Sequence, residues 1–158
     1  MDGSKAFLRE ATDDDASVIL RVLHTAFEEY RGHLDPPSGV HSETVETIRG
    51  KLRVGGAVLA VVDGTVAGCV FYQPEGSHLY LSRLAVLPQY RDQGLGRALT
   101  QYVERRAQEV NLQRVQLGLR LVLADLRAYY ERLGYHFVRQ GAHEGYAAPT
   151  YVVLEKQV

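Results

Sequence analysis

The chain has 158 residues and a formal net charge of -1, with 46% hydrophobic and 23% charged residues. A chain of this length can bury a core without a disulfide or a metal, and it fits one domain, residues 1–158, better than two. The small net charge argues against broad nonspecific affinity for nucleic acid, which requires a clustered basic surface, but it leaves room for a small basic pocket that binds an anion.

Cys69 is the only cysteine, so an intrachain disulfide is excluded. Its place in the apolar run 67–72 predicts a buried side chain rather than a nucleophile. The chain starts with polar residues, without the apolar region of a signal peptide, and no apolar run approaches the roughly 18 residues of a membrane span. We therefore expect a cytoplasmic protein that does not associate with membranes. The six histidines show no metal-ligand spacing, so no metal is expected.

The first expected elements are a short strand at Phe7–Leu8 and a helix that runs from an acidic cap at Asp13–Asp15 to about Tyr30. Apolar residues recur at helical spacing over this second stretch. A loop follows at 32–40, because its adjacent prolines prevent a helix. A second helix is predicted from about residue 42 to residue 52.

Two strands are predicted at 57–62 and 66–72, joined by Asp63-Gly64, which is a strong hairpin-turn signal. A third strand is predicted from about His78 to Leu87. Within it, the stronger apolar residues change from odd to even positions after Ser82-Arg83. A change of parity indicates one extra residue, a β-bulge.

An amphipathic pattern predicts a helix over 94–110, and strict alternation predicts a strand over 115–121. Asp125 is expected to cap a short helix that ends at Gly134.

Two final strands, at 135–138 and 151–154, complete the predicted order. That order is β-α-α-β-β-β-α-β-α-β-β. It indicates the α/β fold class, with one mixed β-sheet flanked by helices.

The segment from Tyr90 to Arg97, with sequence YRDQGLGR, links the third strand to the amphipathic helix. The first N–H groups of a helix lack partners within it and lie at the positive end of its dipole, so this arrangement favours an anion. Gly94 and Gly96 let a phosphate approach the backbone closely, and Arg91 and Arg97 can add charge-assisted hydrogen bonds. The alternative is an ordinary glycine-rich helix start that binds nothing.

Two other phosphate-binding motifs do not fit this segment. The nucleotide P-loop requires Lys followed by Ser or Thr after its last glycine, where this chain has Arg97-Ala98. The dinucleotide-binding fingerprint requires a small third residue, where this chain has Leu99.

The pattern Arg91-x-x-Gly94-x-Gly96, preceded by Leu84-Ala85-Val86-x-Pro88 and opening an amphipathic helix, resembles motif A of the GNAT superfamily of N-acetyltransferases. The element order is similar to that fold across nearly the whole chain. The resemblance implies a cofactor, acetyl-coenzyme A. It implies that backbone groups of Leu84 and Val86, on either side of Ala85, pair with the pantetheine arm and the acyl carbonyl. It also implies a pyrophosphate site made by the backbone of Arg91, Asp92, Gln93, Gly94, Leu95, Gly96 and Arg97.

The family's second landmark is a tyrosine four residues before a glycine-aromatic pair, and Tyr130 has this position before Gly134-Tyr135. The resemblance implies that Tyr130 contacts the cofactor and acts as the general acid that protonates the departing coenzyme A thiolate. A phenol with a reference pKa of about 10 is protonated at neutral pH and can donate in this way. Tyr130 and Tyr129 also belong to an apolar helical stripe, so a purely structural position in the core is the alternative.

The chain departs from the family pattern at two places. Many members have an asparagine seven residues before the tyrosine, where this chain has Leu123; Asp125 is the nearest polar substitute and a candidate for contact with the cofactor, although helix capping also explains it. Family members often use a glutamate on the bulged strand as a base. That strand offers Tyr80, Ser82 and Arg83 here, and none of them is a good base.

An attacking amine must lose a proton, so a base or a chain of waters is expected on the acceptor side. The loops 32–41 and 141–150 are expected near the acceptor, a small-molecule or peptide amine that no motif identifies further. A homodimer would follow family habit, but no residue pattern indicates one. The substrate-binding candidates are Glu28, Glu29, Tyr80, His143 and Glu144.

The expected activity is transfer of an acetyl group from acetyl-coenzyme A to a primary amine by direct attack. One alternative is a noncatalytic acyl-coenzyme A binding or sensing module, which would lose nothing when Tyr130 becomes Phe. Another is a protein-interaction domain that keeps the fold and binds no cofactor.

Overall fold

The computed structural model describes residues 5–158, which form a mixed sheet of seven strands in the order β1-β2-β3-β4-β5-β7-β6. Neighbouring strands are antiparallel except β4 and β5, which are parallel. The strands are β1 (Ala6–Glu10), β2 (Gly56–Val62), β3 (Thr65–Glu75), β4 (His78–Val86), β5 (Arg114–Arg120), β6 (His136–Gly141) and β7 (Tyr151–Gln157).

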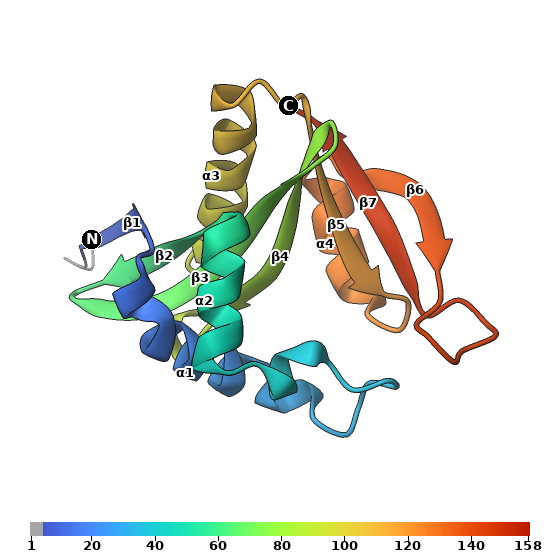
Figure 1. Cartoon of the computed structure of the whole chain (residues 1–158), viewed down its shortest axis with the longest axis horizontal. Helices are drawn as coiled ribbons and strands as arrows, with labels where there is room; N and C mark the ends of the chain where they lie inside the picture. The colour runs from blue at the N-terminus through green and yellow to red at the C-terminus, as the bar shows by residue number, and fades with distance from the viewer. Residues whose placement is uncertain (1–4) are drawn as a thin grey trace.

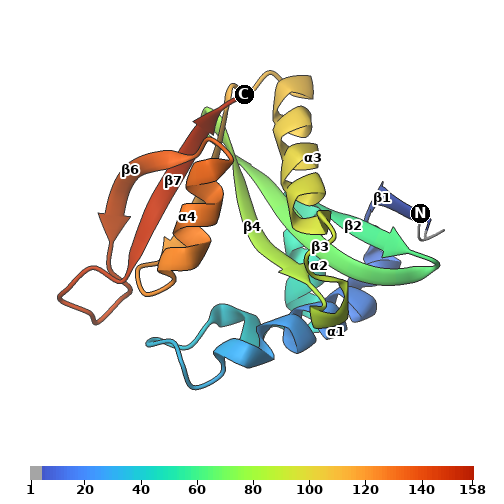
Figure 2. The ribbon, with the colours of Figure 1, turned by 180° about the vertical axis from the view of Figure 1, so that it is seen from behind.

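Four α-helices flank the sheet, with α1 and α2 on one face and α3 and α4 on the other (Figure 1, Figure 2). Apart from short 3-10 turns, the order of helices and strands agrees with the predicted order. Within the described residues, no helix is both long and apolar enough to cross a membrane. The helices are α1 (Ala16–Phe27), α2 (Val45–Val54), α3 (Leu95–Glu109) and α4 (Ala124–Arg132).

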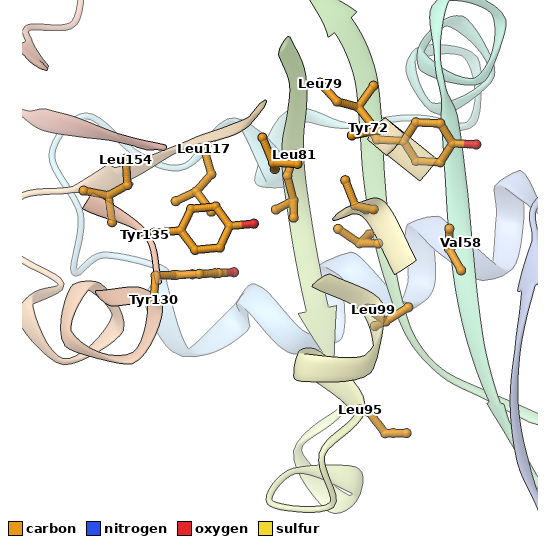
Figure 3. Close-up of a cluster of buried hydrophobic side chains, with 14 of the residues drawn as sticks. Val58, Tyr72, Leu79, Leu81, Leu95, Leu99, Leu117, Tyr130, Tyr135 and Leu154 are labelled. Carbon is orange, nitrogen blue, oxygen red and sulfur yellow. The ribbon is translucent and has the colours of Figure 1, made fainter. Parts of the chain in front are cut away.

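The sheet separates two hydrophobic cores, because successive residues of a strand point to opposite faces. Val58 of β2 and Leu99 of α3 belong to the core under α3 and α4, whereas the next residue of β2, Leu59, packs with α1 and α2. Part of the first core is drawn in Figure 3. Cys69 is fully buried in the second core, as predicted, and desolvation raises the pKa of its thiol to about 12.

The bulge predicted in the third strand is present in β4. Cys69 and Phe71 are two residues apart on β3, but their partners on β4, Ala85 and Ser82, are three residues apart. Arg83 lies in this extra stretch and has φ 54°, a conformation that residues other than glycine seldom adopt. The bulge changes the direction in which the rest of β4 presents its groups.

Two further local predictions had different outcomes. The hairpin turn is confirmed, since Asp63 and Gly64 both have positive φ, as in a type I′ turn. The prediction that Asp125 caps its helix was wrong, because Leu123 is the N-cap of α4 and no side chain caps this end. Asp125 lies in the first turn instead, where a negative charge is favoured by the helix dipole.

The sheet opens between β4 and β5. These strands pair only where Leu79–Leu81 lie beside Val115–Leu117, although β4 continues to Val86 and β5 to Arg120. Beyond the paired residues the two strands diverge (Figure 1). The facing edges of both strands therefore lack strand partners along this length.

Candidate active site

A cleft of about 1090 Å³ lies where β4 and β5 separate. Residues 81–86 of β4 and 117–120 of β5 line it, together with the end of α1 and part of the proline loop. Tyr130 of α4 also reaches it. The unpaired strand edges therefore face a space large enough for a ligand.

Eight of the predicted site residues line the cleft: Leu84, Ala85, Val86, Arg91, Tyr130, Glu29, Tyr80 and His143. The other candidates do not line it. Asp92 to Arg97 follow Arg91 directly and form the turn into α3, whereas Asp125, Glu28 and Glu144 are exposed on other parts of the surface.

The start of α3 has no side-chain cap. Gly94 is its N-cap residue with φ 80°, and its carbonyl accepts the first helical hydrogen bond from the amide of Ala98 at 3.0 Å. By contrast, α2 is capped by Thr44, whose hydroxyl accepts from the amide of Thr47 at 3.2 Å. The first amides of α3 lack partners within the helix, so they are free to bind an anion.

The two glycines of this turn differ in what they require. Gly94 has φ 80°, a left-handed backbone conformation that favours glycine. A Cβ at this position would meet nothing within 4 Å. A Cβ on Gly96 would have ordinary contacts only, the nearest being 3.7 Å from the Tyr129 hydroxyl. The protein's own packing therefore does not require a glycine at position 96, and open space available to a ligand lies beside Gly94.

Arg91 joins the turn to the end of α1. Its Nη1 donates to Glu29 Oε2 at 2.7 Å, its Nη2 to the carbonyl of Ala26 at 3.3 Å, and its Nε to the carbonyl of Val86 at 3.3 Å. The side chain that we expected to bind phosphate is thus engaged by protein groups. It positions the turn relative to α1 and β4.

Tyr130 combines the two predicted alternatives, since it is 3% exposed within the core and also lines the cleft. Its ring packs edge-on against Tyr129 at 5.3 Å and Tyr135 at 5.7 Å between ring centres. Desolvation, with a smaller contribution from Tyr129, raises its pKa, and Thr100 opposes this increase. The hydroxyl end of its ring points toward β4 (Figure 3). The phenol is therefore held rigidly and stays protonated at neutral pH.

A smaller pocket of about 130 Å³ lies between α3 and the end of α4. Arg97 and Arg132 line it with Lys156, whose ammonium also contacts Glu104 at 3.1 Å. Both arginines are close enough to Tyr129 to act on its pKa, which they lower against the larger effect of burial. Positive charge therefore flanks the glycine turn on the α3–α4 face.

The acceptor-side candidates are in different environments. Glu29 is bound by Arg91, while Glu28 pairs with Arg31 at 3.0 Å on the exposed surface. Desolvation, and to a lesser extent the charge of Glu75, raises the pKa of Tyr80, so its phenol is neutral. Neither glutamate is a free base within the cleft.

His143 is the remaining basic candidate that lines the cleft. Its amide donates to the Thr150 hydroxyl at 2.9 Å, and its Nδ1 contacts the same hydroxyl. Desolvation and the positive charge of Arg120 lower its pKa, so the imidazole is mostly neutral at pH 7. A neutral imidazole can accept a proton.

Three arginine side chains that were not predicted as site residues also line the cleft: Arg83, Arg120 and Arg139. Arg83 donates from Nε to Glu43 Oε2 at 3.0 Å, and Arg120 donates from Nη1 to the carbonyl of Pro36 at 2.6 Å. The alternating pattern of β5 could have indicated the direction of Arg120. No local signal indicates that Glu43, 40 residues away, is the partner of Arg83.

No group of three or more His, Cys, Asp or Glu side chains in residues 5–158 is arranged to hold a metal ion.

A family model described as the acetyltransferase (GNAT) family matches residues 20–135. The chain belongs to the GNAT family of acetyltransferases. A comparison with curated proteins found no match. The uncapped α3 start, the bulged β4 and the opening beside β5 all fall within the part of the chain that the GNAT model covers.

Solved structures show the same GNAT fold. PaiA N-acetyltransferase from Thermoplasma acidophilum, in complex with coenzyme A, has a TM-score of 0.83 at 14% identity over 98% of this chain and 99% of its own. The ribosomal-protein-S18-alanine N-acetyltransferase from Escherichia coli has a TM-score of 0.78 at 18% identity, covering 98% and 94%. Ard1 from Thermoplasma volcanium has a TM-score of 0.78 at 18% identity, covering 97% of each chain. The predicted GNAT-like architecture is thereby confirmed.

Proposed function

We propose that this GNAT protein is a single-domain N-acetyltransferase that moves an acetyl group from acetyl-coenzyme A to a primary amine by direct attack. The observation that carries the proposal is the cleft in which the unpaired part of β4 and the Tyr130 side chain meet. A cytoplasmic location and a homodimer stay predictions.

The residues present fit coenzyme A. The free amides at the start of α3 suit a pyrophosphate, and the open space beside Gly94 lets it approach the backbone. Residues 82–86 of β4 have no strand partner toward β5, and the amide groups of a pantetheine arm can pair with such an edge as a strand does. Arg97 and Arg132 add positive charge for phosphate groups beside the turn.

In the proposed step, the amine nitrogen attacks the thioester carbonyl carbon, a C–N bond forms and the C–S bond breaks. The Tyr130 hydroxyl gives its proton to the departing sulfur, and the phenol regains a proton from solvent. The amine gives up its own proton to the neutral imidazole of His143, which lines the cleft, and from there the proton passes to solvent.

Desolvation acts on both partners of the proton transfer to sulfur. It raises the pKa of Tyr130, which makes the phenol a weaker acid, but it also raises the pKa of a thiol, as at Cys69. A thiolate released in the same low-dielectric cleft is therefore a stronger base than in water. The proton transfer stays feasible because both pKa values rise together.

A binding measurement is the first test. The thermal midpoint would be compared with and without acetyl-coenzyme A, with NAD and ATP as controls. Ligand at about 100 times its dissociation constant adds about 2.7 kcal/mol, which for this size is a rise of roughly 5 to 10 °C. A rise with acetyl-coenzyme A alone supports the proposal, whereas no rise would favour a protein-interaction domain.

Turnover of Tyr130→Phe separates catalysis from binding. We expect the variant to keep the thermal shift and to lose about 100- to 10,000-fold in kcat, because only the proton donor is removed. Tyr129→Phe, which changes the neighbouring ring, is the matched control and should keep most activity. Equal rates for wild type and Tyr130→Phe would contradict the assignment of the general acid.

The alternative is a noncatalytic acyl-coenzyme A binding module. It is favoured by one observation, that Glu29, one of the two carboxylates lining the cleft, is already bound by Arg91. Binding of acetyl-coenzyme A without transfer to any amine would support this alternative.

A further inference from the structure

The arginines that line the cleft lie on one face of the sheet. Leu117 and Leu119 of β5 pack in the core under α3 and α4, so the alternating residue Arg120 points to the opposite face. Val153 of β7 lies between Val152 and Leu154, which belong to the same core, so Val153 points to the opposite face. Arg139 of β6 is paired with Val153 and therefore shares its direction. Both guanidinium groups therefore belong to the α1–α2 face, across the sheet from the glycine turn.

Arg83 is on this face too, but its charge is matched. Glu43, whose side chain is 4% exposed, accepts from Arg83 at 3.0 Å and lies 3.6 Å from Lys51. The bulge thus brings a guanidinium to the cleft that a buried carboxylate already neutralises.

The charges of Arg120 and Arg139 are not matched in this way. Among residues 5–158, no carboxylate lies within 4.0 Å of either guanidinium, and Arg120 donates to the carbonyls of Pro36 and Pro37 at 2.6 and 3.3 Å. Asp35, in the same loop, accepts from the Tyr146 hydroxyl instead. Asp35 and Glu75 are the nearby negative charges, but neither is in contact with Arg120 or Arg139, so within the described residues both guanidinium groups are left without a direct carboxylate partner.

Aromatic side chains lie beside the two arginines. A Cβ on Gly118 would lie 2.8 Å from the Tyr80 hydroxyl, so the glycine lets the ring of Tyr80 extend over β5. Tyr80 and Tyr151 line the same cleft as Arg120 and Arg139. The two cations thus border a polar and aromatic pocket rather than open solvent alone.

We propose that the acceptor is an amine that also carries an anionic group, with a carboxylate as the simplest form, and that Arg120 and Arg139 bind this group. The inference rests on the proposed function and specifies its acceptor. Guanidinium groups bind carboxylates strongly and in a fixed geometry. Polyamines and other polycations are disfavoured, because the same charges repel them.

The positive charge has a second consequence for the reaction. An amine bound close to two guanidinium groups loses its proton more readily, since the charged ammonium form is destabilised there. This effect assists deprotonation in a cleft where Glu29 is already bound by Arg91.

The test compares matched acceptors in the presence of acetyl-coenzyme A: amino acids against their carboxamides, and ethanolamine against phosphoethanolamine, with spermidine as a polycation. We expect kcat/KM about 10- to 100-fold higher for the anionic member of a pair, mainly through KM, since a charged hydrogen-bonding pair is lost in the neutral one. The first pair reports a carboxylate and the second a phosphate.

Arg139→Gln is the decisive variant, because no hydrogen bond or ion pair within residues 5–158 is recorded for this side chain that its loss would break. It should reduce kcat/KM for the anionic acceptor by a larger factor than for its carboxamide, so that the preference falls at least severalfold. Arg120→Lys keeps the charge but loses the planar donor group and the contacts to the Pro36 and Pro37 carbonyls, so it should keep only part of the preference. Arg105→Gln, an exposed arginine of α3 outside the cleft, is the matched control and should change nothing.

Equilibrium binding of the acceptor tests the inference independently of turnover. Amino acids and carboxamides would be titrated into protein saturated with coenzyme A. Preferential binding of amino acids that Arg139→Gln removes supports the inference even without transfer. Preference for carboxamides or spermidine, or an equal effect of Arg139→Gln on both members of each pair, would overturn it. A failure of acetyl-coenzyme A to bind would overturn the proposed function instead.

Discussion

Arg83 donates from Nε to Glu43 Oε2 across 3.0 Å, and Arg83 is also the residue with positive φ in the bulge of β4. The buried carboxylate comes from the segment just before α2, and it accepts a hydrogen bond from Thr47 as well. The contact therefore links the N-terminal end of a helix to the unpaired strand edge that borders the cleft. It holds a strained backbone conformation in place.

The first prediction concerns this contact. Glu43→Gln removes the negative charge that Arg83 and Lys51 share, so we expect a loss of about 1–3 kcal/mol in the free energy of unfolding and a weaker affinity for acetyl-coenzyme A. Urea unfolding and a binding titration measure the two effects. Glu46→Gln, an exposed glutamate in the first turn of α2, should change the free energy of unfolding by no more than about 0.5 kcal/mol.

Gly96→Ala should separate stability from binding. A Cβ at this position meets only ordinary contacts inside α3, so replacing glycine should stabilise the helix by about 0.5–1 kcal/mol. The same methyl group adds bulk to the turn that we propose binds the pyrophosphate, so affinity for acetyl-coenzyme A should fall. Gly50→Ala, in open space within α2, should stabilise without any change in affinity. Unchanged binding by Gly96→Ala would place the pyrophosphate elsewhere.

The third prediction is a pH dependence of kcat. A general acid must be protonated, and burial raises the pKa of Tyr130 above its usual value near 10, so the phenol is retained throughout the neutral and mildly alkaline range. The rate should therefore rise with pH as the amine loses its proton and then stay level up to about pH 10. A decrease of kcat between pH 8 and pH 9.5 that is absent from Tyr130→Phe would mean that the pKa of Tyr130 is not raised.

Asp15 provides a prediction about acid stability. Its carboxylate accepts two hydrogen bonds of 2.9 Å from Arg9, which chiefly lower its pKa to about 2 from 3.8. Because the unfolded state binds the proton first, this contribution is complete at neutral pH and is lost as the pH falls from about 4 through about 2. Asp15→Asn should lower the free energy of unfolding by about 1 kcal/mol at pH 7, a value reduced for the 41% exposure of Arg9.

The control for this prediction is Asp14→Asn, an exposed neighbour that should have little effect. The difference between wild type and Asp15→Asn should shrink to nothing near pH 2. A difference that persists undiminished at pH 2 would show that the ion pair is not its source.

Much of the fold could be predicted because its signals are local. The parity change around Ser82-Arg83 is visible within one strand, and Asp63-Gly64 is a turn signal complete in two residues. The boundaries of β6 could not be predicted well, because this edge strand is exposed on both faces and lacks alternation. The prediction that Asp125 is the N-cap of α4 was wrong because an acidic residue is favoured both at a cap and in the first turn.

The site was less accessible to prediction because its contacts join distant residues. The ion pair of Arg91 with Glu29 spans 62 positions and that of Arg83 with Glu43 spans 40, and neither follows from the spacing of charges along the chain. No pattern in the sequence indicates the opening between β4 and β5 either. β5 alternates normally beyond the three paired residues, and the parity change in β4 indicates a bulge but not a separation from β5, so only the structure shows that the two strands part there.

Strand edges without partners normally invite foreign strands and lead to aggregation. Here two such edges face each other inside the molecule, with helices on both faces of the sheet beside them (Figure 1). A folded neighbour cannot insert a strand into a gap enclosed in this way, whereas a slender, unbranched chain with amide groups can. The opening costs the sheet several hydrogen bonds. It thus admits only molecules that are narrow enough to fit between the two strands.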